Sequence, residues 1–272
     1  MRGTRAAQTL GHAHLLDRIA EHLDTYEGFV AWSGGKDSTA VVDLARRVDP
    51  DVPVAFYHSG LEFPETTSYI SELADRWNLD LTVIPAEPDL LTMLVAAGSF
   101  DHSAPSHTLG FRMHDRLVLE PAARAHEMFG IGSMWGVRAA ESAGRRQLYR
   151  AALADELAAH CPAGCCGPDA AAASRPRRHG GVVRRSDGTV TFGPIWNWST
   201  SQVLEYLAAR EIAPNPLYRK LVALGVDELT ARVDAILDAN RLDGGAVTRL
   251  QRGWPDLFDR LCGALPRLRD YA

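Results

Sequence analysis

Short apolar runs alternate along the chain with segments whose apolar residues recur at helical spacing. The runs at residues 28–32, 54–57, 81–84 and 132–137 have the length and composition of buried strands. The helical spacing predicts helices at about residues 13–26, 39–45, 65–77, 89–97 and 112–128. Strands and helices that alternate in this way predict an α/β fold with a doubly wound, mainly parallel sheet.

The second half of the chain departs from this alternation. Residues 161–181 read as a loop, and residues 182–185 and 189–192 follow as a β-hairpin joined through Asp187-Gly188. Later apolar patterns predict helices at 199–210, about 217–240 and 253–264. We therefore expect three consecutive segments, which are an α/β core at 1–160, a Cys- and Arg-rich loop with the hairpin at 161–198, and a helical C-terminal part at 199–272.

A glycine-rich turn joins the first predicted strand to the helix that follows it. Its two glycines let the backbone approach a ligand, and the first amides of the helix can then converge on phosphate oxygens. Lys36 adds a positive charge, while Asp37 and Ser38 fall where a helix takes its N-cap and also offer oxygen ligands for Mg²⁺. The alternative is a plain strand-to-helix connector. The pattern favours a nucleotide-binding core whose phosphate site is formed by Ser33, Gly34, Gly35, Lys36, Asp37 and Ser38.

This compact Ser-Gly-Gly-Lys-Asp-Ser turn resembles the PP-loop of the ATP pyrophosphatase superfamily, which has the adenine nucleotide alpha hydrolase-like fold. Three further segments resemble one branch of it, the phosphoadenosine phosphosulfate reductase family. They are His-Ser-Gly-Leu-Glu-Phe-Pro-Glu-Thr at 58–66, Trp-Gly-Val-Arg-Ala-Ala-Glu-Ser with Arg145 at 135–145, and Pro-Ile-Trp-Asn-Trp-Ser with Asn-Pro-Leu-Tyr at 194–218. His58 and Ser59 stand where the family has Asp-Thr.

The resemblance implies an enzyme that cleaves ATP between the α and β phosphates and adenylylates an acceptor. Sulfur transfer, as in the DNA phosphorothioate modification carried out by members of this branch, would follow. The cofactors implied are ATP and Mg²⁺. A thiol-dependent reductase of phosphoadenylyl or adenylyl sulfate, which releases sulfite, is the alternative. A third interpretation is a nucleotide-sensing scaffold without turnover.

The resemblance also assigns residues. Lys36, Asp37 and Arg138 would act in catalysis, because phosphoanhydride cleavage needs the charge of the leaving pyrophosphate neutralised. The nucleotide would be bound by the turn at 33–38 and by His58, Ser59, Gly60, Arg138 and Arg145. Two simpler alternatives stay open, since Arg138 could pair with Glu141 and His58 could satisfy a strand-end hydrogen bond.

Four cysteines leave the chemistry of sulfur open. Three of them cluster in the predicted loop, and their thiolates, with a fourth ligand such as Cys262, would suit zinc or an iron–sulfur cluster. The candidate metal ligands are Cys161, Cys165, Cys166 and Cys262. A redox thiol and plain loop cysteines remain the alternatives. The family's nucleophilic cysteine lies in a C-terminal Glu-Cys-Gly-x-His motif, of which only Cys262-Gly263 is present here, on a predicted amphipathic helix.

Composition and charge indicate where the protein is expected to act and what it is expected to bind. The chain has 272 residues with a net charge of −5, a hydrophobic content of 46%, no run long enough for a membrane span and no secretion signal, so we expect a cytoplasmic protein. A local basic patch around residues 175–185 is either a solvated loop or a site for a phosphate-rich substrate. The expected partners are an adenine nucleotide, a nucleic-acid or protein acceptor, a sulfur-donor protein and, as a further option, a second copy of the chain.

Overall fold

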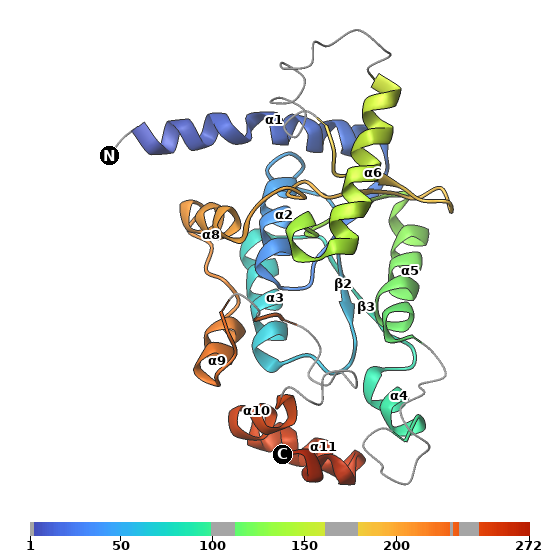
Figure 1. Ribbon diagram of the computed structural model, residues 1–272, viewed down its shortest axis with the longest axis vertical. Coiled ribbons are helices and arrows are strands. Elements are labelled where there is room, and N and C mark those ends of the chain that lie inside the picture. The colour runs from blue at the N-terminus through green and yellow to red at the C-terminus, as the bar shows by residue number, and fades with distance from the viewer. Residues whose placement is uncertain (1–2, 99–111, 161–178, 229–230, 234–244) are drawn as a thin grey trace. The chain divides into compact units, whose positions relative to one another are not determined.

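A computed structural model (Figure 1) describes residues 3–98, 112–160, 179–228, 231–233 and 245–272, with side chains from residue 12 onward except that of His160. The chain divides into two compact units that interleave along the sequence. The first unit comprises residues 1–56, 74–82 and 125–214, and the second comprises 57–73, 83–124 and 215–272. The division into 1–160, 161–198 and 199–272 stays a prediction.

A sheet of six strands in the order β3-β2-β1-β4-β6-β5 forms the framework. Pairing is parallel between β1 and β2, between β1 and β4, and between β4 and β6, whereas β5 runs antiparallel to β6. This confirms the mainly parallel sheet and the hairpin predicted from the sequence. The strands are β1 (Gly28–Ala31), β2 (Val54–His58), β3 (Leu81–Pro85), β4 (Gly132–Trp135), β5 (Val182–Arg184) and β6 (Val190–Phe192).

In the first unit, the helix that follows β1 is fixed to a helix far along the chain. These are α2 (Lys36–Arg46) and α8 (Thr200–Ala209), which lie side by side (Figure 1). Asp43 of α2 is fully buried, and its carboxylate accepts hydrogen bonds from Tyr206 Oη at 2.7 Å and Arg210 Nε at 2.8 Å. Burial opposes ionisation, but these bonds overcome it and hold the pKa of Asp43 below its usual value.

The remaining helices are distributed over both units. Leu61, Phe63 and Trp254 belong to an apolar cluster of the second unit, where Glu65 also bonds Lys220 Nζ at 2.6 Å and Trp254 Nε1 at 2.9 Å. The elements are α1 (Gly3–Thr25), α3 (Pro64–Trp77), α4 (Leu90–Ala96), the π-helical segment Asp115–Leu119, α5 (Glu120–Phe129), the 3-10 turn Ala139–Glu141, α6 (Ala143–His160), α9 (Leu217–Ala223), α10 (Ala246–Gly253), α11 (Pro255–Ala264) and the 3-10 segment Pro266–Tyr271.

One predicted helix is much shorter than expected. The helix predicted at 217–240 ends at Ala223, because Gly225 adopts a left-handed conformation with φ of 88°. Residues 229–230 and 234–240 of this prediction lie outside the described residues. The amide of Gly225 bonds the carbonyl of Val222, and that of Val226 bonds the carbonyl of Leu221, which is a Schellman ending. The sequence analysis also missed α6 and α10. Among the described helices, none has both the length and the apolar character needed to cross a membrane.

A buried histidine of α1 makes the stability of the first unit depend on pH. His22 is 6% exposed and contacts the rings of Tyr26 and Phe192. Its Nε2 atom is buried and has no hydrogen-bond partner among the residues that the structure describes. Burial lowers the pKa of His22 from 6.5 to about 4.

We predict that the free energy of unfolding falls as the pH is lowered from 6.5 to about 4. In this window the unfolded chain takes up a proton that the folded chain does not, which costs on the order of 3 kcal/mol. Chemical denaturation across this range should show that His22→Gln flattens the acid slope. The exposed His14 of the same helix provides the control, and His14→Gln should leave the slope as in the wild type. Identical slopes in all three proteins would contradict the prediction.

Candidate nucleotide site

The turn between β1 and α2 has the backbone of an anion site. Gly34 takes a φ of 71°, which a glycine adopts without strain. Gly35 is the N-cap residue of α2, so no side-chain hydrogen bond caps this helix end. The first amides of a helix have no partner within it, and they carry the positive end of the helix dipole. This helix end therefore suits the negative charge of a phosphate.

Two serines brace this turn from within. Ser38 Oγ donates to the carbonyl of Gly35 at 3.1 Å, and it accepts from the amide of Ser33 at 3.2 Å. The Ser33 hydroxyl lies 3.1 Å from it. The expectation that Asp37 or Ser38 caps the helix is wrong, because α2 begins at Lys36 and both residues lie in its first turn.

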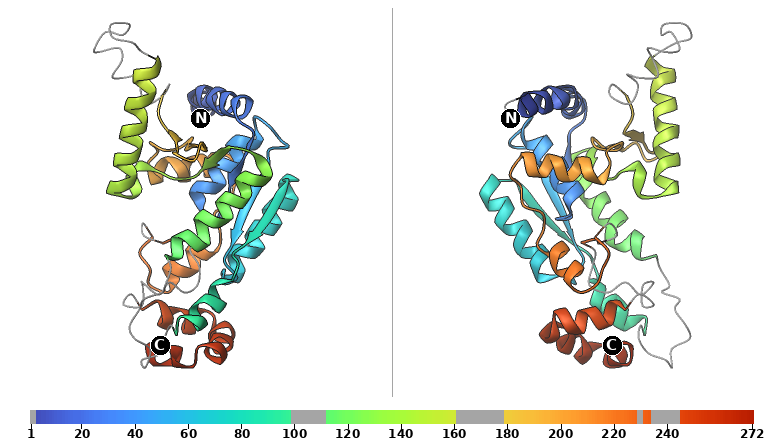
Figure 2. Two further views of the ribbon diagram at one scale, coloured as in Figure 1. Left: turned by 90° about the vertical axis from the view of Figure 1, so that its right-hand side faces the viewer. Right: turned by 60° about the vertical axis from the view of Figure 1, so that its left-hand side comes forward.

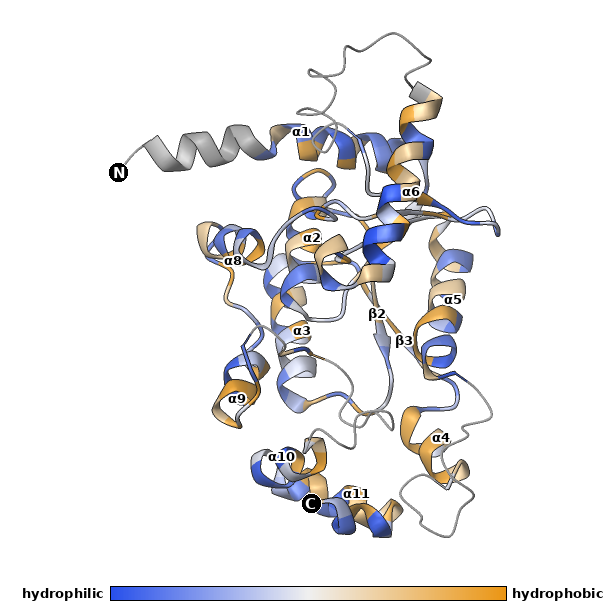
Figure 3. Ribbon diagram, viewed as in Figure 1, coloured by the Kyte–Doolittle hydropathy of each residue, from blue (hydrophilic) through white to orange (hydrophobic). Residues whose placement is uncertain are grey.

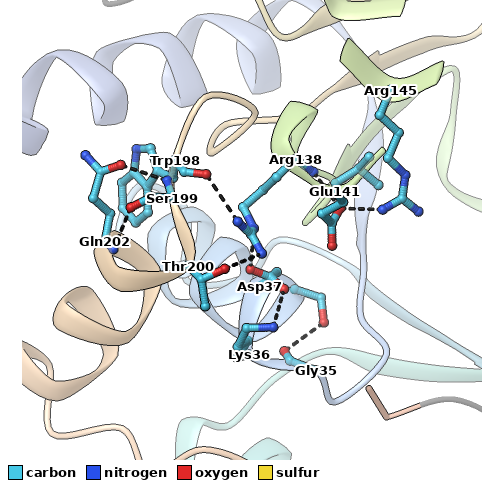
Figure 4. Close-up of polar contacts among 12 residues, drawn as sticks. Gly35, Lys36, Asp37, Arg138, Glu141, Arg145, Trp198, Ser199, Thr200 and Gln202 are labelled. Carbon is cyan, nitrogen blue, oxygen red and sulfur yellow. Dashed lines mark hydrogen bonds and ion pairs between the residues drawn. The ribbon is translucent and has the colours of Figure 1, made fainter. Parts of the chain in front are cut away.

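Asp37 holds the turn through a buried arginine. Arg138 is 4% exposed, and its Nε donates to Asp37 Oδ1 at 2.7 Å. Its two terminal nitrogens donate to the carbonyl of Trp198 and to Thr200 Oγ1, each at 3.3 Å (Figure 4). The guanidinium group thus joins the start of α2 to the start of α8, and its donors face the protein.

Lys36 adds a second positive charge at the same carboxylate. Its Nζ lies 3.1 Å from Asp37 Oδ2, and the side chains of Lys36 and Asp37 are 16% and 14% exposed. Lys36 and Arg138 together carry two positive charges against the single negative charge of Asp37. The start of α2 therefore keeps a net positive charge, which adds to that of its helix dipole.

The backbone that follows β4 touches the first turn of α2. A Cβ atom on Gly136 would lie 2.4 Å from the amide nitrogen of Ser38, so a side chain at this position would collide with the backbone of the turn. This approach brings Arg138, two residues further on, to Asp37. Close packing therefore requires glycine at position 136, which also belongs to the motif at 135–145.

Glu141 fixes the backbone at Arg138 and also contacts Arg145. Its Oε2 accepts from the backbone amide of Arg138 at 3.0 Å and also pairs with Arg145 Nη1. The alternative in which the side chain of Arg138 pairs with Glu141 is therefore not what the structure shows. The side chain of Arg145, at 38% exposure, lies beside Glu141 in Figure 4.

His58, Ser59 and Gly60 form a turn in the second unit. His58 Nδ1 accepts from the amide of Gly60 at 3.2 Å, and Ser59 Oγ accepts from the amide of Leu61 at 3.1 Å. Glu62 closes the turn, since its Oε1 accepts from the amide of Ser59 at 2.6 Å and its Oε2 lies 3.1 Å from His58 Nε2. The side chain of His58 is 34% exposed.

The candidate metal ligands are not brought together in the described part of the chain. Cys161, Cys165 and Cys166 lie outside the described residues. Cys262 is 7% exposed within the apolar cluster of the second unit, and burial raises the pKa of its thiol. Within the described ranges, no group of three or more His, Cys, Asp and Glu side chains is arranged to hold a metal ion.

Sequence reasoning missed two partners of the site, the carbonyl of Trp198 and the hydroxyl of Thr200. Trp198 lies within the Pro-Ile-Trp-Asn-Trp-Ser segment at 194–199 that the sequence analysis quoted, and Thr200 directly follows it. No local pattern links them to Arg138, from which they are separated by 60 and 62 positions.

Comparison with known proteins shows which family the chain belongs to. The phosphoadenosine phosphosulfate reductase domain model matches residues 27–232. The phosphoadenosine 5'-phosphosulfate reductase of Serratia proteamaculans (strain 568) is 25% identical over 216 residues, which cover 78% of this chain and 73% of that protein. That of Aliivibrio salmonicida (strain LFI1238) is 25% identical over 206 residues, with coverage of 74% and 67%.

A solved structure shares the fold. The phosphoadenylyl-sulfate (PAPS) reductase from Candida auris, a phosphate complex, superposes with a TM-score of 0.51 at 16% sequence identity, covering 80% of this chain and 90% of that one. The fold and its turn define an α/β protein of the adenine nucleotide alpha hydrolase, or PP-loop, type. More particularly, the chain belongs to the phosphoadenosine phosphosulfate reductase domain family, a family of enzymes. The resemblance drawn from the four motifs is confirmed.

We predict that Gly136→Ala destabilises the fold by about 1–3 kcal/mol, since the added methyl group displaces the first turn of α2. Thermal unfolding and nucleotide titration should both show the effect. Gly144→Ala is the matched control, because a Cβ there meets nothing within 4 Å and alanine favours the helix α6. The control should be neutral or slightly stabilising, and equal losses in both variants would contradict the packing argument.

Proposed function

We propose that the chain is an ATP pyrophosphatase of the phosphoadenosine phosphosulfate reductase family that adenylylates an acceptor for sulfur transfer. An oxygen of the acceptor attacks the α-phosphorus of ATP. The bond from that phosphorus to the bridging oxygen breaks, and pyrophosphate leaves with the electron pair. A nucleic acid is the acceptor we favour, and a sulfur-donor protein would then act on the adenylylated product.

The uncapped, positively charged start of α2 is the observation that carries this proposal. Pyrophosphate concentrates negative charge as it leaves, and fixed amides with a lysine beside them stabilise that charge without rearrangement. Lys36 supplies a positive charge at this turn, because its side chain is partly exposed and its Nζ lies 3.1 Å from Asp37 Oδ2. The glycines of the turn keep its backbone accessible to phosphate oxygens.

Arg138 and Asp37 take positioning roles in this proposal. The donors of Arg138 are directed at Asp37, Trp198 and Thr200, so the guanidinium fixes the turn rather than gripping a phosphate. Arg145, further exposed, remains a proposed contact for the nucleotide. His58, Ser59 and Gly60 also remain proposed contacts, through a turn whose amides are already ordered by side chains.

The residues first considered for Mg²⁺ do not fit that ion as they are arranged. Both oxygens of Asp37 have a cationic partner, Arg138 for Oδ1 and Lys36 for Oδ2. The hydroxyl of Ser38 is used within the turn. We therefore propose that Mg²⁺ accompanies ATP as its counter-ion, and we assign it no ligand in this chain.

Lys36→Ala should lower the rate of pyrophosphate release from ATP and Mg²⁺ by about a hundredfold or more, the scale for losing one preorganised charge at a leaving group. The fold should be retained, because Lys36 is the first residue of α2 and its side chain is partly exposed. Pyrophosphate and AMP are measured together, with circular dichroism as the test of folding. Arg252→Ala, which removes an exposed positive charge from the second unit, should leave the rate unchanged. Equal rates in wild type and Lys36→Ala would refute the site assignment.

A second candidate is a thiol-dependent reductase of phosphoadenylyl sulfate, which the names of the curated relatives favour. Such an enzyme needs a thiolate that attacks sulfur. Cys262 does not suit this step, because it is buried among apolar side chains and its pKa is raised.

We therefore expect Cys262→Ser to leave pyrophosphate release at the wild-type rate. Sulfite release is assayed in parallel with phosphoadenylyl sulfate and a dithiol reductant. Sulfite formation that depends on Cys262, with no AMP formed from ATP, would replace the main proposal by the reductase.

A further inference from the structure

Four exposed arginines lie on two neighbouring elements of the first unit. Arg146 and Arg150 belong to α6, and Arg184 and Arg185 belong to the β5–β6 hairpin. None of the four forms an ion pair with a carboxylate among the residues the structure describes. We call Arg146, Arg150 and Arg185 the α6–hairpin face. Arg184 projects to the other side of the hairpin, where its guanidinium lies over the ring of Tyr26.

The two elements of this face are side by side. Figure 2 shows α6 next to the hairpin in both views, and α6 packs on β5. Arg146 and Arg150 are four positions apart and so project from the same side of the helix. Tyr149 of α6 is buried, and a Cβ atom on Gly193, directly after β6, would lie 2.4 Å from its hydroxyl oxygen.

Arg146 is placed where its charge does not stabilise the isolated fold, whereas Arg184 lies over the ring of Tyr26 and Arg185 Nε donates to Thr191 Oγ1 at 3.3 Å. The first turn of α6 contains Arg145 and Arg146 and no acidic residue, although the start of a helix favours negative charge. Figure 3 shows hydrophilic residues recurring along this helix. The chain as a whole has a net charge of −5, so this cationic face runs against its overall composition. Such local conflicts are expected where a surface serves a ligand.

The face is connected to the candidate nucleotide site. Arg145, adjacent to Arg146 in α6, pairs with Glu141, which holds the backbone of Arg138. Arg138 in turn bonds Asp37 in the phosphate turn. An anionic chain lying on α6 would therefore pass close to the residues that fix the nucleotide site.

We propose that the α6–hairpin face binds the sugar-phosphate backbone of a nucleic acid and brings it to the nucleotide site as the acceptor. This inference rests on the proposed function. Guanidinium groups match phosphate oxygens with paired donors. Charges spread over a helix and a hairpin suit a chain of phosphates better than a single phosphate, which one pocket would hold. Binding of this kind is read from the salt dependence of affinity.

The experiment measures fluorescence anisotropy of a labelled DNA duplex of mixed sequence, titrated with the full chain at several salt concentrations. Arg146→Gln with Arg150→Gln should weaken binding about tenfold or more and reduce the salt slope by about 2, and Arg185→Gln should reduce the slope by about 1. Arg219→Gln with Arg252→Gln removes equal charge from exposed positions of the second unit and should change neither quantity. Circular dichroism checks that each variant is folded.

Three outcomes would overturn the inference. They are no binding by the wild-type chain, equal losses in the control pair, and displacement of the duplex by polyglutamate as effectively as by unlabelled DNA. Pyrophosphate release from ATP, measured without nucleic acid so that water takes the place of the acceptor at the α-phosphorus and AMP is formed, tests the proposed function separately. Loss of DNA binding with that basal release retained supports the face, whereas DNA binding by a chain that never releases pyrophosphate refutes only the enzymatic proposal.

Discussion

The pairing of Asp37 with Arg138 is the interaction on which the candidate site depends. It joins the phosphate turn, the segment after β4 and the start of α8, which are far apart in the sequence. Burying a guanidinium costs several kcal/mol unless its donors are satisfied. Here the carboxylate, a carbonyl and a hydroxyl satisfy them, so any movement of α2 away from α8 would leave a buried charge without partners. The folded chain can therefore bury this pair only when the turn lies next to the start of α8.

A second buried charge makes this attachment rigid. Asp43 lies two turns further along α2 and bonds Tyr206 and Arg210 near the end of α8. One contact would allow the two helices to pivot, but contacts at both ends restrict their rotation as well as their separation. The amides at the start of α2 therefore keep a fixed direction. Fixed dipoles stabilise charge that develops on a ligand without the cost of turning toward it.

The sequence allowed the elements of this site to be predicted, but not its connections. The turn at 33–38 is local, because glycines, lysine and the flanking apolar runs are contiguous. The partner of Arg138 is 101 positions away, and no periodicity carries that information. The helix predicted at 217–240 was too long because apolar spacing outweighed the Leu224-Gly225 ending. Helix α6 was missed because arginines and a glycine occupy its first turn, where a helix start normally has acidic residues.

The departure at His58 shows how a motif can change its residues and keep its geometry. The carboxylate of an aspartate at such a position accepts a hydrogen bond from the backbone amide two residues further on, as in an Asx-turn. His58 does the same through Nδ1, which accepts from Gly60, and Ser59 offers its hydroxyl to Leu61 as a threonine would. The backbone of the turn depends on the position of an acceptor atom, which imidazole and carboxylate both provide. The exchange removes a fixed negative charge, and the negative charge of the turn then resides on Glu62, which faces His58 and the amide of Ser59.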